Sequence, residues 1–477
     1  MATLRLGAIA DALGGELTLG STPPAGGAEH AVEGYSIDSR SVKRGDLFFA
    51  LVGPQHDGHR FVGAALEGGA VAVIVGRGSG PFPEAPALIR VPDTTRALQD
   101  LGAHVRRVRP LKVVGITGSA GKTTAKELTA AVVAERYRAY RSEGNLNNTY
   151  GLPLSLLRMP DDREAAVLEM GMSYHGEITR LVEIGDPDVG VILNVLPVHL
   201  EHFGRLEKIA EAKGELFRTM HEDAVAVYNA DDPPTAKLGR AFAGRSIPYS
   251  VSSKSARIGA DDITVEGLAG SRFTLRVGKE TVRARIGIPG RHNIYNALAA
   301  AASGDALGIG AEAVARAIGS VQPVSMRGVL HRLKDGICLL DDTYNSNPPA
   351  MERVIEILVE SQPRGRRVLV SGDMLELGSH GRKAHAHLGE QVAAAGIDLF
   401  VAVGPLSEQS AAAARSGGGA IEVHHFADST TAADFVATAL RAGDLIVVKG
   451  SRGTAMERVV RAVMASIPPD ARGGRQR

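Results

Sequence analysis

Short runs of apolar residues alternate with helix-like segments along most of the chain. In the middle of the chain, such runs occupy residues 113–117, 165–170, 189–195 and 224–229, and segments with helical spacing separate them. A strand that is apolar throughout is typical of a sheet buried on both faces, and helices between the strands favour parallel pairing. We therefore expect a parallel sheet here, preceded by a helix over residues 94–108.

The pattern divides the chain into three expected α/β domains, over residues 1–88, 89–322 and 323–477. The first has short strand-like pieces joined by turns rich in Gly, Pro, Asp and His, which predicts a small α/β unit. The last repeats a strand followed by a helix, as a smaller Rossmann-like unit does. Within the central domain, residues 262–288 alternate apolar and polar positions, which suggests an antiparallel hairpin at the edge of the sheet.

Composition supports a globular protein of several domains. The chain has 477 residues, which is long for one core, and 44% of them are hydrophobic while 22% are charged. The formal net charge is +1, and no dense run of Lys and Arg occurs. We therefore expect no nucleic-acid or anionic-membrane partner.

The cysteine content and the apolar runs bear on the compartment. Cys338 is the single cysteine, so no intrachain disulfide can form, as is usual for a reducing compartment. The first 20 residues lack the charged and then continuous apolar regions of a signal peptide. No run of about 18 apolar residues suggests a transmembrane helix. We expect a cytoplasmic protein.

The segment GITGSAGKTT at 115–124 carries the clearest chemical signal. It follows an apolar strand and enters a helix, so its backbone N–H groups can surround a phosphate. A lysine in this position supplies a charge to the terminal phosphates, and the next hydroxyl can reach Mg²⁺. The nucleotide-binding residues that we expect are Gly118, Ser119, Ala120, Gly121, Lys122, Thr123 and Thr124.

Two features limit what this loop means by itself. The strict pattern has a small residue at position 116, where Ile116 stands, and a glycine-rich turn without a ligand is the alternative. The Asn-Lys-x-Asp motif that selects guanine is absent, because no Asn-Lys pair occurs in the chain. We therefore expect ATP as the nucleotide and no GTP switch.

Polar residues follow the neighbouring strands at their carboxyl ends. Glu169 ends the run at 165–170, and the segment after the run at 189–195 contains His199. Carboxyl ends of parallel strands meet at one edge, so Glu169 can share a Mg²⁺ with the hydroxyl of Thr123. A helix-capping role for Glu169 and a structural role for His199 remain open. The residue types alone leave Lys213 and Asn145 undecided.

The phosphate loop and seven further segments resemble the Mur ligase family. In chain order the further segments are EGNLNNTYGLPLSLL, EMGMSYHGEI, VHLEHFG, EAKGELF, PGRHNIYNALAAAA, DDTYNSNP and KGSRG. In the first domain, YSIDSRSVKRGDLFFAL and DGHRF look like the branch that adds D-alanyl-D-alanine to a UDP-N-acetylmuramoyl-tripeptide. The resemblance implies a ligase of peptidoglycan synthesis that uses ATP and Mg²⁺ and forms an acyl phosphate, and we expect it to act as a monomer. It also implies an N-terminal domain for the UDP substrate, a central ATPase domain, and a C-terminal domain that closes over ATP.

The resemblance assigns roles residue by residue. Lys122 matches the lysine that contacts the terminal phosphates, and Thr123 and Glu169 match the holders of one Mg²⁺. His199 matches the histidine near a second Mg²⁺, and Lys213 matches a lysine that many members carry as a carbamate. Asn145 matches an asparagine that contacts a phosphate, and the segment that lines the adenine pocket is matched by His292, Asn293 and Asn296. In the C-terminal domain, Arg327 and Asp342 match groups that reach the nucleotide on closure, and Lys449 and Ser451 match its last turn. Ser39 and Arg40 match the UDP-side loop of the first domain.

Three departures and two alternatives accompany this resemblance. Asn345 stands in DDTYNSNP where related branches have His, and Arg327 follows Met326 where the branch has Pro-x-x-Gly-Arg. The Asp-Asn-Pro-Arg motif is missing, which argues against the branch that adds diaminopimelate. Another ligase on the same scaffold, of the folylpolyglutamate or cyanophycin type, is one alternative. A P-loop protein that binds nucleotide without ligation is the other.

Overall fold

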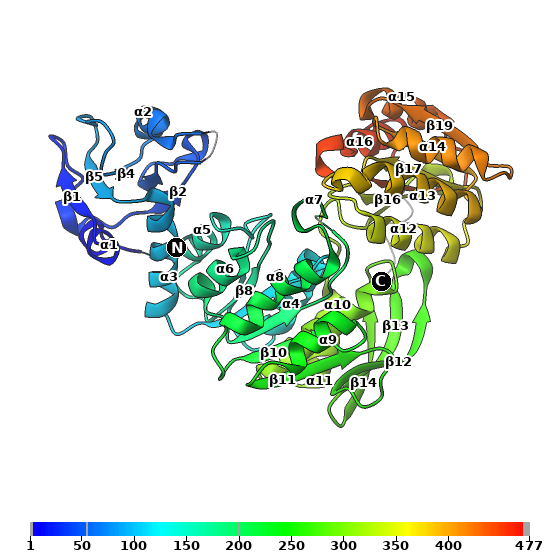
Figure 1. Ribbon diagram of the computed structural model, residues 1–477, viewed down its shortest axis with the longest axis horizontal. Coiled ribbons are helices and arrows are strands. Elements are labelled where there is room, and N and C mark those ends of the chain that lie inside the picture. Colours follow the sequence, from blue (N-terminus) through cyan, green and yellow to red (C-terminus); the bar gives the residue numbers. More distant parts are fainter. Residues whose placement is uncertain (1–2, 54–55, 199, 471–477) are drawn as a thin grey trace.

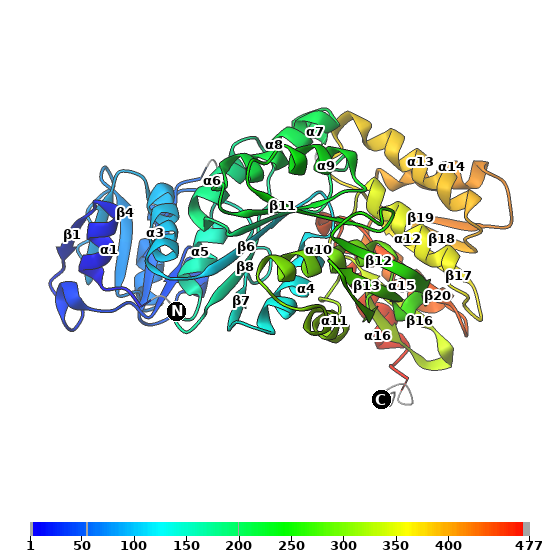
Figure 2. The same cartoon turned by 90° about the horizontal axis from the view of Figure 1, so that it is seen from below.

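The chain folds into three sheets, each covered by helices, so the α/β prediction is confirmed. The structure, a computed structural model, describes residues 3–53, 56–198 and 200–470. The sheets have five, nine and six strands in chain order. Figures 1 and 2 show the first and last sheets at opposite ends of the central one. No helix in the described part of the chain is long and apolar enough to cross a membrane.

The N-terminal sheet has the strand order β1-β5-β4-β3-β2, with only β1 antiparallel to its neighbour. Its elements are α1 (Leu6–Leu13), β1 (Glu16–Leu19), β2 (Gly34–Ser36), β3 (Asp46–Phe49), α2 (Val62–Glu67), β4 (Ala72–Gly76) and β5 (Ala87–Val91). The expected domain boundary at residue 88 falls inside β5. The helix α3 (Thr94–Val108) follows over the residues expected for it and packs between this sheet and the central one.

The central sheet has the order β14-β13-β12-β11-β10-β9-β6-β8-β7. Its strands are β6 (Lys112–Thr117), β7 (Ala139–Arg141), β8 (Ala165–Glu169), β9 (Val189–Ile192), β10 (Val225–Asn229), β11 (Arg245–Ser250), β12 (Ile258–Val265), β13 (Ser271–Val277) and β14 (Glu280–Ile286). Pairing is parallel from β7 across to β12 and antiparallel for β13 and β14. The parallel sheet and its antiparallel edge are therefore as predicted.

Helices cover both faces of the central sheet. Alternate strand residues enter opposite cores, since Val114 packs with α4, α10 and α11 while Val113 packs with α5, α6 and α8. The helices are α4 (Lys122–Ala134), α5 (Gly151–Arg158), α6 (Glu177–Gly185), α7 (Leu200–Phe203), α8 (Leu206–Thr219), α9 (Pro233–Arg240), α10 (His292–Ala306) and α11 (Ala311–Ser320). The alanine run of α10 lets this helix lie close against α4, the helix that follows the phosphate loop.

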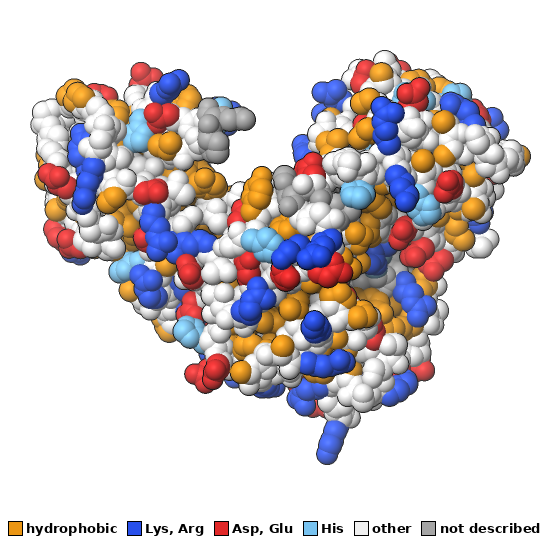
Figure 3. Space-filling model, in the orientation of Figure 1, with side chains coloured by type: hydrophobic (Ala, Val, Ile, Leu, Met, Phe, Trp, Pro, Cys, Tyr) orange, Lys and Arg blue, Asp and Glu red, His pale blue; other side chains and the backbone are white. Residues whose placement is uncertain are grey.

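The C-terminal sheet has the order β15-β16-β20-β17-β18-β19, parallel except for β15, as in a Rossmann-like unit. Its elements are β15 (Val329–Arg332), β16 (Cys338–Asp342), α12 (Pro348–Glu360), β17 (Arg367–Gly372), α13 (Gly381–Ala394), β18 (Leu399–Val403), α14 (Ser407–Ser416), β19 (Glu422–Phe426), α15 (Ser429–Ala439), β20 (Leu445–Lys449) and α16 (Glu457–Ser466). The expected boundary after residue 322 lies between α11 and β15. Figure 3 shows a wide hollow between the N- and C-terminal units, above the central one.

Candidate active site

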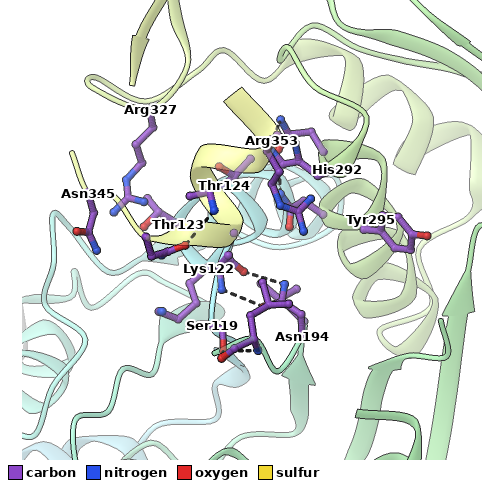
Figure 4. Close-up of a pocket in the computed structure, with 18 of the residues that line it drawn as sticks. Ser119, Lys122, Thr123, Thr124, Asn194, His292, Tyr295, Arg327, Asn345 and Arg353 are labelled. Atoms are coloured by element: carbon purple, nitrogen blue, oxygen red, sulfur yellow. Dashed lines mark hydrogen bonds between the residues drawn. The ribbon is translucent and has the colours of Figure 1, made fainter. Parts of the chain in front are cut away.

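A cavity of about 890 Å³ lies between the carboxyl ends of the central strands and the C-terminal unit. The central unit contributes the phosphate loop, the ends of β8, β9 and β10, and the first turn of α10. The C-terminal unit contributes the end of β16, the first turns of α12, and the connection before β15. Figure 4 shows side chains from both units converging on the loop.

The phosphate loop is held open by contacts that leave its centre free. Ala120 donates its N–H to the side-chain oxygen of Asn194 (2.9 Å), and the Asn194 amide donates back to the Ala120 carbonyl (3.1 Å). Ser119 exchanges hydrogen bonds with the backbone of Leu196 (2.9 and 3.1 Å). Gly121 has φ +84°, a left-handed conformation that favours glycine, just before α4 begins. The helix N-terminus therefore faces the cavity as an anion site.

Lys122 is the cation of this loop. Its ammonium donates to the Gly118 carbonyl at 2.8 Å, which folds the side chain back over the loop. Burial lowers the pKa of Lys122, and the positive charge of Arg327 lowers it further. The Glu169 carboxylate acts in the opposite direction and raises this pKa. Lys122 and Arg327 therefore act on the same space, although they belong to different units.

Glu169 is buried at the end of β8 with both carboxylate oxygens engaged. The Thr123 hydroxyl donates to one oxygen at 2.9 Å, and the Asn147 side-chain amide donates to the other, also at 2.9 Å. Asn147 lies in the same NLNN stretch as the predicted Asn145, which lines the cavity as well. Sequence reasoning missed Asn147, because nothing in the pattern indicates which asparagine turns toward Glu169.

Thr123 and Glu169 fit Mg²⁺ in the chemistry of their donors. A hydroxyl and a carboxylate are hard oxygen donors, and Mg²⁺ is usually held by one or two carboxylates together with phosphate oxygens and water. Among the residues that the structure describes, no group of three or more His, Cys, Asp or Glu side chains is arranged to hold a metal ion. Phosphate oxygens and water are the usual further ligands of such a site.

The first turn of α10 forms the wall of the cavity beside the loop. His292, Asn293 and Asn296 all line the cavity. Asn296 donates to the Asn293 side-chain oxygen at 2.9 Å, and a Cβ on Gly121 would lie 2.5 Å from the Asn296 side-chain oxygen. Burial, with the charges of Arg353 and Lys449, lowers the pKa of His292 to about 3, so its imidazole is neutral.

Residues of the C-terminal unit close the opposite side. Arg327, Asp342 and Lys449 line the cavity, and Lys449 forms an ion pair with Asp342 at 2.5 Å. In Figure 4, Arg327 points toward Thr123. Arg353 of α12 lines the cavity near His292 and was not singled out in the sequence, because an arginine within a helix is usually a surface residue.

Other predicted residues lie away from the cavity lining. Lys213 is buried in α8, and Gly118, although part of the phosphate loop, does not line the cavity. Ser451 accepts a hydrogen bond from the Leu375 N–H at 2.9 Å, which stabilises the C-terminal unit. Ser39 and Arg40 belong to the N-terminal unit, where the exposed Arg40 side chain pairs with Asp38. His199 lies outside the described residues.

The arrangement suits a nucleoside triphosphate. Cations from two units and the start of a helix can neutralise phosphate charge, while Ile288, Pro289 and Ile357 provide an apolar wall for a base. The Glu169 carboxylate and the Thr123 hydroxyl line the cavity beside the loop, where they could hold a cation bound to phosphate. The cavity is therefore suited to phosphoryl transfer with groups contributed by two units.

Comparisons with known proteins agree with this geometry. Family models described as Mur ligase middle domain, Mur ligase glutamate ligase domain and Mur ligase catalytic domain match residues 116–304, 326–452 and 31–135. The UDP-N-acetylmuramoyl-tripeptide–D-alanyl-D-alanine ligase of Escherichia coli is 37% identical over 97% of this chain and 99% of its own length. The ligase of the same name from Bacillus subtilis is 35% identical over 91% of this chain and 94% of its own.

Solved structures give the same result. MurF from Acinetobacter baumannii superposes with a TM-score of 0.86 at 29% identity, over 98% of this chain and 99% of its own. MurF ligase from Thermotoga maritima, solved in complex with ADP, superposes with a TM-score of 0.79 at 29% identity, over 91% of this chain and 97% of its own. The three-unit architecture is therefore shared over nearly the full length.

Proposed function

This chain belongs to the Mur ligase family, and we propose that it is the ATP-dependent ligase that joins D-alanyl-D-alanine to a UDP-N-acetylmuramoyl-tripeptide. The observation that carries the proposal is the likeness, over 97% of the chain, to a ligase of that name. The cavity supports it, because a phosphate loop from the central unit and cations from the C-terminal unit face each other across it. The product would be a peptidoglycan precursor.

The reaction would proceed through an acyl phosphate. A carboxylate oxygen of the tripeptide attacks the γ-phosphorus of ATP, and ADP leaves. The amine of D-alanyl-D-alanine then attacks the acyl carbon, the C–N bond forms, and inorganic phosphate leaves with that carboxylate oxygen. Lys122, Arg327 and the loop N–H groups would neutralise charge on the transferring phosphoryl group, so positioning and electrostatics carry the catalysis.

Thr123 and Glu169 would hold a Mg²⁺ ion, which would supply positive charge to stabilise the charge that develops on the transferring phosphoryl group. We propose that His199 acts near a second ion, as the family resemblance implies. Asn145 would contact a phosphate, while His292, Asn293 and Asn296 would line the adenine pocket.

We further propose that Lys213 is carbamylated. Burial lowers the pKa of Lys213 well below its ordinary value, and the positive charge of Lys122 lowers it further. A neutral amine is the form that attacks CO₂, with release of a proton. Because the Lys213 amine has no hydrogen bond or ion pair within the described part of the chain, the carbamate would replace an unpartnered buried amine with an anion that Lys122 attracts.

The larger substrates would span the hollow between the units. Ser39 and Arg40 would lie on the UDP side of the N-terminal unit, and Lys449 and Ser451 would support the substrate side of the C-terminal unit. Domain closure would bring these surfaces together, so small-angle scattering with nucleotide and UDP substrate should show compaction. We propose that the enzyme acts as a monomer in the cytoplasm on small-molecule substrates alone.

Phosphate release tests the function directly. With UDP-muramoyl-tripeptide, ATP and D-alanyl-D-alanine together, we expect phosphate and a tripeptide extended by two residues, and no phosphate when either acceptor or amine is left out. Lys122→Ala should abolish turnover. Hydrolysis of ATP without acceptor and amine would indicate a nucleotide-binding protein that does not ligate. Turnover with glutamate-adding substrates instead would indicate a folylpolyglutamate or cyanophycin type of ligase.

A further inference from the structure

The aromatic ring of Tyr344 lies directly beneath the guanidinium of Arg327. The guanidinium carbon is 3.8 Å from the ring centroid, well within cation–π distance. Both side chains are half-buried and line the cavity, so water screens this contact less than it would screen a surface contact. Tyr344 follows the end of β16, whereas Arg327 lies in the connection that leads from the central unit into the C-terminal one.

The backbone ties the same two segments together. The Tyr344 N–H donates to the Met326 carbonyl at 3.1 Å, and the Arg327 N–H donates to the Val324 carbonyl at 3.0 Å. Met326 has φ +63°, a left-handed conformation that is unfavourable for a side chain of its kind. The connection is therefore a tight turn that Tyr344 holds both through its backbone and through its ring.

The ring leaves every donor of Arg327 available. The Arg327 guanidinium makes no hydrogen bond or ion pair with the described residues, so its N–H groups are not consumed by the protein. A carboxylate partner would fix an arginine equally well, but it would cancel the charge and occupy the donors. A ring face fixes the guanidinium plane while its edge still points into the cavity.

Arg327 also acts on the phosphate loop in this structure. Its positive charge lowers the pKa of Lys122, and Figure 4 shows it pointing toward Thr123 at the start of α4. We propose that Tyr344 is a positioning residue that presents Arg327 to the terminal phosphates of ATP when the C-terminal unit closes. This inference rests on the proposed function, since it assumes that the cavity takes ATP.

Ring electronics provide the decisive test. The Tyr344 hydroxyl makes no hydrogen bond with the described residues, so Tyr344→Phe should retain wild-type kinetics. Tyr344→Leu should lower kcat/KM for ATP about tenfold, the size of a partly desolvated cation–π contact. Phenylalanine carrying one, two or three fluorines at position 344 should lower kcat/KM stepwise, because fluorine weakens the ring quadrupole with little change in shape. KM for D-alanyl-D-alanine should stay unchanged throughout.

Two controls separate this role from a merely structural one. Arg136 lies over the ring of Tyr137 at 5.5 Å, just after the C-terminal end of α4, so Tyr137→Leu removes a cation–π contact away from the cavity and should leave the kinetics unchanged. In an Arg327→Met background, Tyr344→Leu should have no further effect if it acts through Arg327.

The possible outcomes are distinct. Equal kcat/KM across the fluorinated series, or an additive loss in the Arg327→Met background, would overturn the proposal even if the wild-type enzyme ligates normally. If the wild-type enzyme fails to ligate, the proposed function is at fault instead. If Tyr344→Leu does not fold, the fluorinated series still decides the question, because those rings retain the packing.

Discussion

Replacing Asn147 with leucine should weaken the magnesium site without touching a proposed magnesium ligand. Asn147 donates to Glu169 at 2.9 Å, and Glu169 is only 3% exposed, so the lost hydrogen bond leaves a buried carboxylate oxygen without its donor. Leucine matches the branching of asparagine, and the Asn147 side chain packs against Gly171, so a closely similar shape is required there.

The structure sets the size of the effect. A hydrogen bond to a charged group contributes about 1.5–3 kcal/mol, equivalent to roughly 10- to 150-fold in an equilibrium constant. We expect the Mg²⁺ concentration that gives half-maximal turnover to rise about tenfold, the lower end of this range. The effect is at the lower end because Asn147 is only half-buried and water can partly replace its amide. Adenine contacts are distant from this change, so the affinity for ADP without metal should stay the same.

Calorimetric titration of ADP at a series of Mg²⁺ concentrations measures this effect apart from turnover. Asp428→Ala is a suitable control, because it removes the cap of α15 in the C-terminal unit and costs about 1 kcal/mol of stability away from the cavity. That variant should show the wild-type response to Mg²⁺. An Asn147→Leu enzyme with wild-type Mg²⁺ dependence in both assays would refute the reasoning.

Three further predictions concern the same cavity. Lys213→Ala should lose activity and regain part of it with small carboxylates; full activity of the unsupplemented variant, measured by phosphate release, would exclude a carbamate. Gly121→Ala should lower the affinity for ADP in calorimetry, because φ +84° is strained for alanine and its Cβ would meet Asn296 at 2.5 Å. An unchanged affinity would contradict the proposal that this loop binds the nucleotide. The pKa of His292 is about 3 in the folded chain and 6.5 ordinarily, so below pH 6.5 only the unfolded state gains its proton and stability falls as pH falls. Relative to wild type, the free energy of unfolding of His292→Gln should therefore rise by about 2 kcal/mol on going from pH 8 to pH 5, as measured by denaturant unfolding. A difference between variant and wild type that is the same at both pH values would argue against a buried neutral imidazole.

Sequence patterns predicted the sheets well because burial on both faces leaves a strong signal. The strands at 113–117 and 165–170 and the helix at 94–108 were found almost to the residue. Several strands escaped, two of them for clear physical reasons: β11 contains Pro248 and polar residues near the edge of the parallel region, and β19 carries two histidines and is only half-buried.

The site was predictable where one segment determines its own geometry. The phosphate loop needs only its strand, its glycines and its helix, so Lys122 and Thr123 could be placed from sequence alone. Contacts between distant segments leave no local pattern. Asn194 meets the loop from the next strand, and the stack of Tyr344 on Arg327 depends on how two segments fold together.

The fate of a carboxylate oxygen tests the central claim most directly. UDP-muramoyl-tripeptide labelled with heavy oxygen in its terminal carboxylate would be incubated with the enzyme, ATP and D-alanyl-D-alanine, and mass spectrometry would follow both products. An acyl phosphate requires one labelled oxygen to leave in the inorganic phosphate as the extended peptide forms. Unlabelled phosphate, or labelled tripeptide recovered without extension, would contradict the account.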